Sequence, residues 1–192
     1  APAPAAPTRV SATTPVRARR GIIEDIKFAP ASSASAGGFL ATGGHDRMVD
    51  VYAVEADGVG SVALRQVACC RGHSSTVVHL DWSSDGAVLQ SNSADREQLL
   101  WQMPSGRQLV GAAAEHASVV WATWTCALGF PVIGIWPDAS DGTDINAVHR
   151  TRDERLVVTA DDFGSVKLFH APCVVEDAPY QLATGHCSHV TS

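Results

Sequence analysis

Short apolar stretches separated by turn residues fill the chain from Ile22 onward. Runs of four to eight residues that are rich in aliphatic and aromatic side chains and bounded by Gly, Asp or Ser are typical of β-strands. No window keeps a 3.6-residue period over the length of a helix. The pattern therefore predicts an all-β chain. We expect its strands at 23–28, 39–44, 48–54, 64–70, 76–82, 87–93, 98–103, 107–111, 145–151, 155–161, 165–170 and 180–184.

These strands form three groups of four, and each group repeats one pattern: an Asp in a turn, then an aromatic residue in the next strand. The separation is six residues in the first two groups and seven in the third: Asp46 and Tyr52, Asp95 and Trp101, Asp162 and Phe169. Gly-His dipeptides open the second group at 72–73 and follow the third at 185–186. A four-stranded unit of about 40–45 residues with these features is the signature of a WD-repeat blade.

The pattern thus predicts a partial WD-repeat β-propeller over residues 22–192. We expect four-stranded blades at approximately 22–71, 72–111 and 145–184, and the first strand of a fourth blade in residues 185–192. Successive aromatic positions are 49 and then 68 residues apart, so a segment over 112–144 is inserted between the second and third blades.

The N-terminal residues 1–21 differ from the rest of the chain. They are rich in Pro, Ala and Arg and have no apolar periodicity, so they cannot bury enough surface to offset their ordering entropy. We expect a disordered arm or linker here. The acid-free, Arg-rich composition is also typical of an organelle transit peptide, which stays open as an alternative.

One set of polar residues in the second blade resembles the hydrogen-bonded chain that fixes the geometry of WD repeats. Its members are His73, Ser91, Asp95 and Trp101, with Asp95 expected to bond His73, His73 to bond Ser91, and Ser91 to bond the Trp101 indole. A Ser-His-Asp triad of a hydrolase is the alternative for three of them. The repeat pattern already accounts for the spacing, and we therefore expect a structural network, no catalytic residues and no enzyme.

Composition and charge narrow the classes of partner. The chain is 45% hydrophobic and 18% charged, which is typical of a globular protein. Its net charge is −6, and because Arg9, Arg17, Arg19 and Arg20 give the arm +4, the remainder carries −10. An acidic body argues against nucleic acid as a partner, and no apolar run reaches the roughly 18–20 residues of a membrane helix.

Candidate metal and cofactor motifs are weak. The five cysteines contain no C-x-x-C pair, which argues against a zinc ribbon. Asp138, Asp141 and Asp144 lack the alternating spacing and final Glu of a calcium loop, and Asp-Phe-Gly at 162–164 occurs without the other kinase motifs. We interpret both as turns and predict no metal and no cofactor.

Three longer segments resemble one known family. The sequences "WATWTCALGFPVIGIWPDASDGTDINAVHR" (121–150) and "TADDFGSVKLFHAPC" (159–173) are similar to the second propeller of the echinoderm microtubule-associated protein-like family. Residues 72–106 resemble the preceding blade of that family, and the resemblance runs from about Ile22 to Ser192.

The resemblance implies a non-enzymatic scaffold of the cytoskeleton that binds tubulin or microtubules and lies in the cytoplasm. It also implies that basic N-terminal segments contact the microtubule. A generic WD-repeat platform for other proteins, without tubulin binding, is the alternative, because a fold does not fix a function.

Overall fold

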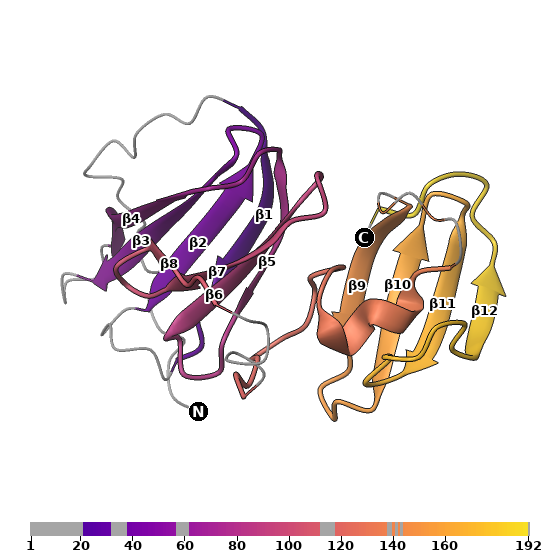
Figure 1. Cartoon of the computed structure of the whole chain (residues 1–192). Coiled ribbons are helices and arrows are strands. Elements are labelled where there is room, and N and C mark those ends of the chain that lie inside the picture. Colours follow the sequence, from indigo (N-terminus) through magenta and orange to yellow (C-terminus); the bar gives the residue numbers. More distant parts are fainter. Residues whose placement is uncertain are drawn as a thin grey trace, which may run out of the picture.

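The computed structural model contains three separate four-stranded antiparallel sheets (Figure 1). It describes residues 21–31, 38–56, 62–111, 118–137, 140, 142 and 144–191. In each sheet the strands follow one another in chain order, each paired with the next. We call these sheets blade 1, blade 2 and blade 3. They confirm the all-β class and the repeated four-stranded unit.

The strand bounds agree with the predicted ones to within three residues. Blade 1 consists of β1 (Ile23–Phe28), β2 (Phe39–Gly44), β3 (Met48–Ala56) and β4 (Val62–Arg71). Blade 2 consists of β5 (Val77–Trp82), β6 (Val88–Ser93), β7 (Gln98–Gln102) and the short β8 (Arg107–Gln108). Blade 3 consists of β9 (Ile145–Arg150), β10 (Leu156–Asp161), β11 (Ser165–His170) and β12 (Tyr180–Thr184).

Blades 1 and 2 share one apolar core. Alternate residues of β2 and β3 point toward blade 2, because successive side chains of a strand lie on opposite faces. Val49 and Val51 of blade 1 and Leu80 and Leu89 of blade 2 are completely buried in this common cluster. Trp82 completes it with a ring stacked on Phe39 at 6.4 Å.

Blade 3 has a core of its own, which the inserted segment completes. Within the described part of that segment, η2 (Phe130–Ile135) is a short 3₁₀ helix that lies in front of blade 3 (Figure 1). Val132 and Ile135 are buried against Val157 and Phe169 of the blade. The backbone of Cys173, which follows β11, holds the helix through two hydrogen bonds of 2.8 Å, to Gly134 and Pro131.

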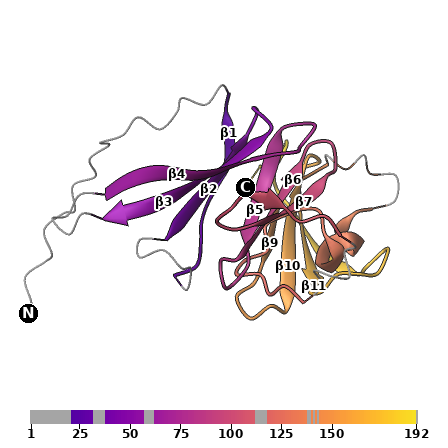
Figure 2. The same cartoon turned by 60° about the vertical axis from the view of Figure 1, so that its left-hand side comes forward.

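The inserted segment also connects blade 3 to blade 2. The Ala122 amide donates to the Trp82 carbonyl at 2.9 Å, and the Arg150 amide donates to the Trp124 carbonyl at 3.0 Å. Residues 121–124 therefore bond the end of β5 on one side and the end of β9 on the other. Figure 2 shows β3 and β4 of blade 1 extending away from the other two sheets.

The two ends of the chain differ from the blades. Residues 185–191, where we predicted the opening of a fourth blade, form no strand. Val190 is nevertheless buried, and its amide donates to the Asp161 carbonyl at 3.0 Å. The predicted arm lies outside the described residues, except for Gly21. No helix in the described ranges is long and apolar enough to cross a membrane.

Candidate functional site

A chain of buried polar side chains crosses blade 2. The Trp101 indole on β7 donates to the Ser91 hydroxyl on β6 at 2.8 Å, and Ser91 lies 2.6 Å from Nε2 of His73. Nδ1 of His73 is 3.0 Å from a Glu97 carboxylate oxygen. Because Ser91 accepts from Trp101, we assign its proton to the bond with His73, and the imidazole then donates from Nδ1 to Glu97. Every member has a partner, as buried polar groups require.

The carboxylate in this network belongs to Glu97, where we predicted Asp95. Asp95 instead accepts a hydrogen bond of 2.8 Å from the hydroxyl of Ser74, the neighbour of His73. Arg96 adopts a left-handed conformation with φ 60°, which turns the chain between the two acidic residues. Glu97 leaves that turn beside Ser93, and its side chain, one methylene longer than that of Asp, extends to His73. His73, Ser91 and Trp101 lie together through the hydrogen bonds given above.

Further hydrogen bonds converge on Glu97. It accepts from the Ser74 amide at 3.0 Å and the Ser93 hydroxyl at 2.8 Å, and it shares the single proton of the Ser74 hydroxyl, 2.8 Å away, with Asp95. These bonds, led by the Ser74 amide and joined by His73, lower the pKa of Glu97 to about 2. Burial lowers the pKa of His73 below its usual value, in spite of the adjacent carboxylate. The pair is therefore a neutral imidazole beside a carboxylate near pH 7.

This geometry is unlike a hydrolytic triad. Ser91 is completely buried, and its hydroxyl is occupied by Trp101 and His73. A nucleophile needs an exposed oxygen beside space for a substrate. Asp95 is bonded to Ser74, so it does not orient His73. The arrangement can stabilise a blade, and it offers no attacking group.

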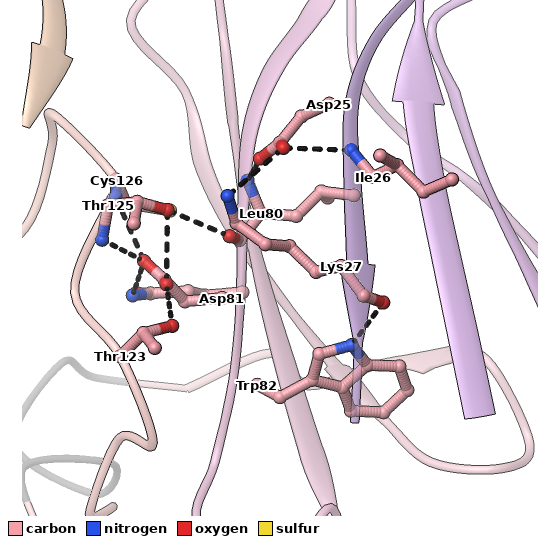
Figure 3. A network of polar contacts seen from close by, with 10 residues as sticks. Asp25, Ile26, Lys27, Leu80, Asp81, Trp82, Thr123, Thr125 and Cys126 are labelled. Carbon is pink, nitrogen blue, oxygen red and sulfur yellow. Dashed lines mark hydrogen bonds and ion pairs between the residues drawn. The ribbon is translucent and has the colours of Figure 1, made fainter. Parts of the chain in front are cut away.

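A second set of contacts joins blade 1 to blade 2 (Figure 3). The Leu80 amide on β5 donates to the Asp25 carboxylate on β1 at 2.8 Å. The Trp82 indole donates to the Lys27 carbonyl at 3.1 Å. Lys27 also forms an ion pair with Asp25 at 3.1 Å. Polar bonds from β1 to β5 thus accompany the apolar core described above.

Asp81, between those two residues of β5, faces the opposite way and holds the inserted segment (Figure 3). Its side chain is completely buried. It accepts from the amides of Thr125 at 2.7 Å and Cys126 at 2.9 Å, and from the hydroxyls of Thr123 at 2.6 Å and Thr125 at 3.1 Å. We did not predict this site. Its single signal in the sequence is an acidic residue inside an apolar strand, which must find donors when it is buried.

A cleft of about 790 Å³ runs along the innermost strands of the three sheets. Asp25 and Lys27 of β1, His79 of β5 and His149 of β9 are among the residues that line it. Among the described residues, no three or more His, Cys, Asp or Glu side chains gather in a way that could hold a metal ion. Charged, polar and apolar side chains all line the cleft.

The two motifs interpreted as turns differ in what the structure describes. Asp138 and Asp141 lie outside the described residues. Phe163 of the Asp-Phe-Gly sequence is 72% exposed in the turn between β10 and β11. The Asp161 carboxylate closes that turn by accepting from the amides of Phe163 at 3.0 Å and Ser165 at 2.8 Å.

The matching family model and the similar known proteins all point to one family. The family model described as "Echinoderm microtubule-associated protein second beta-propeller" matches residues 5–192, so the match begins before Ile22. Echinoderm microtubule-associated protein-like 3 of Mus musculus is 48% identical over 154 residues, which cover 80% of this chain and 17% of the relative. Echinoderm microtubule-associated protein-like 1 of Rattus norvegicus is 47% identical over 156 residues, 81% of this chain and 19% of the relative.

A third relative extends the comparison beyond mammals. Echinoderm microtubule-associated protein-like 4 of Xenopus tropicalis is 44% identical over 156 residues, 81% of this chain and 16% of the relative. The chain therefore spans less than a fifth of the length of each of these three relatives.

Proposed function

This chain belongs to the echinoderm microtubule-associated protein-like family, and we propose on that basis that it is part of a non-enzymatic scaffold that binds tubulin. The observation that carries the proposal is the identity of 48% over 80% of the chain to a relative that is named for its association with microtubules. The expected location is the cytoplasm, on microtubules.

The structure supports a role in binding through its distribution of polar groups. His73, Ser91, Asp81 and Trp101 all direct their polar atoms at other parts of the same chain. Their hydrogen bonds hold the blades and the inserted segment. The blade surfaces and the cleft along β1, β5 and β9 are then the parts of the described chain that a partner protein can reach.

The proposal is tested by co-sedimentation of the purified 192-residue chain with polymerised tubulin over a series of tubulin concentrations. Saturable pelleting above the level without tubulin is expected. Pelleting that stays at this background would overturn tubulin binding by this part of the family. Serum albumin at the same concentration provides the control for trapped protein.

The arm is a candidate for an electrostatic part of that contact. Arg9, Arg17, Arg19 and Arg20 could meet the acidic tails of tubulin, and salt would weaken such a contact. Replacing all four by Ala should lower the affinity and flatten its salt dependence. If both stay unchanged, the arm makes no electrostatic contribution.

A generic platform for other proteins is the second candidate function. It is favoured by the net charge of −10 outside the arm, since an acidic body gains nothing from the acidic tails of tubulin. Under this alternative the chain with intact arginines fails to pellet with microtubules while its thermal unfolding remains cooperative.

A further inference from the structure

The last strand of blade 3 has one side without a neighbour among the described strands. β12 pairs with β11 through five successive residue pairs, from Phe169 opposite Tyr180 to Ser165 opposite Thr184. It ends the order of its sheet, and Figure 1 shows it at the outer margin of blade 3. All five of its residues are exposed. The backbone N–H and C=O groups that point away from β11 are therefore open to pairing with a further strand.

The corresponding outer strands of blades 1 and 2 are protected against such pairing. Charged side chains, irregular register and short length are the usual protections of an edge strand. β4 carries Arg65 and Arg71, and its register with β3 is interrupted. β8 has two residues, one of which is Arg107. β12, with the sequence Tyr-Gln-Leu-Ala-Thr, has no charge, no Pro and an unbroken register. Of these three strands, β12 is thus the one suited to accept another strand.

Two large side chains of β12 lie beside this edge. Tyr180 is opposite Phe169 and Leu182 is opposite Lys167, so both are on the side of blade 3 where Phe169 packs against the inserted segment. With that segment in place, Tyr180 is still 51% and Leu182 55% exposed. The Tyr180 ring lies 5.3 Å from the Phe169 ring and 5.6 Å from Nζ of Lys167, which fixes its position. A strand added to β12 would cover both exposed side chains.

The composition of β12 makes the strand complementary to a second copy of itself. Leu182 is the central residue of the five, so antiparallel pairing about a two-fold axis at Leu182 aligns the whole strand without an overhang. The cross-strand pairs are then Leu182 with Leu182 of the second copy, Tyr180 with Thr184, and Gln181 with Ala183. Apolar pairs and pairs of an aromatic with a β-branched residue stabilise antiparallel sheets, and no like charges lie opposite each other in this register.

We propose that two copies of this chain associate edge to edge through β12, so that their blade 3 sheets join into one antiparallel sheet. Such a contact has two-fold symmetry, the commonest symmetry of soluble oligomers. Five residues of strand are about 17 Å long, which gives a small contact compared with that of a stable dimer. The association is therefore weak and reversible. It uses a surface other than the cleft along β1, β5 and β9, and it does not depend on tubulin binding.

The net charge of the chain sets the expected salt dependence of this association. Each copy carries a net charge of −6, so two copies repel each other at low ionic strength. Salt screens this repulsion and should strengthen the pairing of the uncharged edges. The proposed contact between the arginines of the arm and tubulin has the opposite salt dependence, so the two kinds of association can be told apart.

Sedimentation velocity of the whole 192-residue chain, from micromolar to millimolar concentration, measures the equilibrium between monomer and dimer. Leu182→Lys should raise the dissociation constant about tenfold, because the two-fold axis sets two positive charges directly opposite each other. The fold should be unaffected, since Leu182 is largely exposed. The matched control is Val110→Lys, which adds the same charge at a position that is 87% exposed and lies beyond β8. It should leave the equilibrium unchanged.

A mixture of two variants tests the register of the pairing. Leu182→Lys and Leu182→Glu should each associate weakly, and an equimolar mixture should associate several-fold more strongly, because opposite charges then face each other across the axis. A defect in folding would not be cured by mixing.

Three results would overturn the proposal. The unaltered chain could remain monomeric up to millimolar concentration, which would leave the edge to an extended segment of another protein. Val110→Lys could weaken the association as much as Leu182→Lys, or the mixture could show no recovery. None of these results changes the pelleting with microtubules that is expected at micromolar concentration.

Discussion

The two junctions between blades are built in different ways. Blades 1 and 2 meet through one apolar cluster that draws side chains from both sheets, with Trp82 at its centre. Blades 2 and 3 are connected through the inserted segment, which buries its own residues in blade 3 and is fixed to blade 2 by Asp81. Burial of apolar surface is non-directional, whereas a carboxylate with several donors fixes a geometry. The first junction therefore supplies bulk stability, and the second depends on a few bonds.

The interiors of blades 2 and 3 also differ in the polar contacts that they contain. Phe169 occupies the position of Trp101 in the repeat, and its side chain has no N–H or O–H group that could donate a hydrogen bond. Thr159 of β10, which corresponds to Ser91, is buried. An ion pair of 3.0 Å between Lys167 and Asp161 supplies a polar link in blade 3. Blade 3, which has no Trp at this position, is thus stabilised by other contacts.

The largest effect is expected for Trp82→Ala, which breaks the apolar junction. Trp82 is 2% exposed, stacks on Phe39 and donates to Lys27. Removing a buried Trp typically costs about 3–5 kcal/mol of unfolding free energy. Urea unfolding followed by circular dichroism measures the loss. Phe130→Ala is the control, because Phe130 is 74% exposed and its removal should cost far less.

A smaller loss is expected for Asp81→Ala, which breaks the polar junction. The amides of Thr125 and Cys126 and the hydroxyl of Thr123 would lose their acceptor inside the protein. Each unsatisfied buried group costs about 1–3 kcal/mol when the structure does not relax. Relaxation of the inserted segment reduces the sum over the three groups, and we expect a total loss of unfolding free energy of about 3 kcal/mol. Hydrogen exchange should show faster opening of residues 121–126 than of β2. Equal acceleration in both would contradict a local role.

The assignment of Glu97 in place of Asp95 is tested by a pair of conservative changes. Glu97→Gln removes the charge that His73, Ser74 and Ser93 share, and it should lower stability by about 1–2 kcal/mol. Asp95→Asn affects one exposed bond to Ser74 and should change stability by less than about 0.5 kcal/mol. Thermal unfolding of the two variants side by side measures the difference. A larger loss of stability in Asp95→Asn than in Glu97→Gln would indicate that Asp95 is the carboxylate of the network.

The smallest effect is a pH dependence of stability. The pKa values of His73 and His79 are lowered, chiefly by burial, so below about pH 6.5 the unfolded chain binds protons that the folded chain does not. The unfolding free energy should therefore decrease as the pH falls below 6.5. Glu97, with its pKa lowered to about 2, adds a further loss below about pH 4.5. His73→Asn should reduce the slope near pH 6, and a flat profile in the unaltered chain from pH 7.5 to 5 would contradict the role of burial.

Local patterns sufficed to predict the strands, because short apolar runs between Gly, Asp and Ser leave few alternatives. The polar network was predictable for His73, Ser91 and Trp101, since the repeat fixes their spacing. The choice between Asp95 and Glu97 depended on the left-handed turn at Arg96, which the sequence does not reveal. The partners of Asp81 lie more than 40 residues further along the chain, so only the folded structure brings them together.

Leu80, Asp81 and Trp82 are consecutive, and because a strand alternates its side chains, they serve both junctions from one short stretch of β5. A one-residue slip in the pairing of β5 would exchange the two sides and release both neighbours together. The native contacts of both junctions therefore depend on the alignment of this tripeptide. We therefore expect few substitutions at these three positions in homologous proteins.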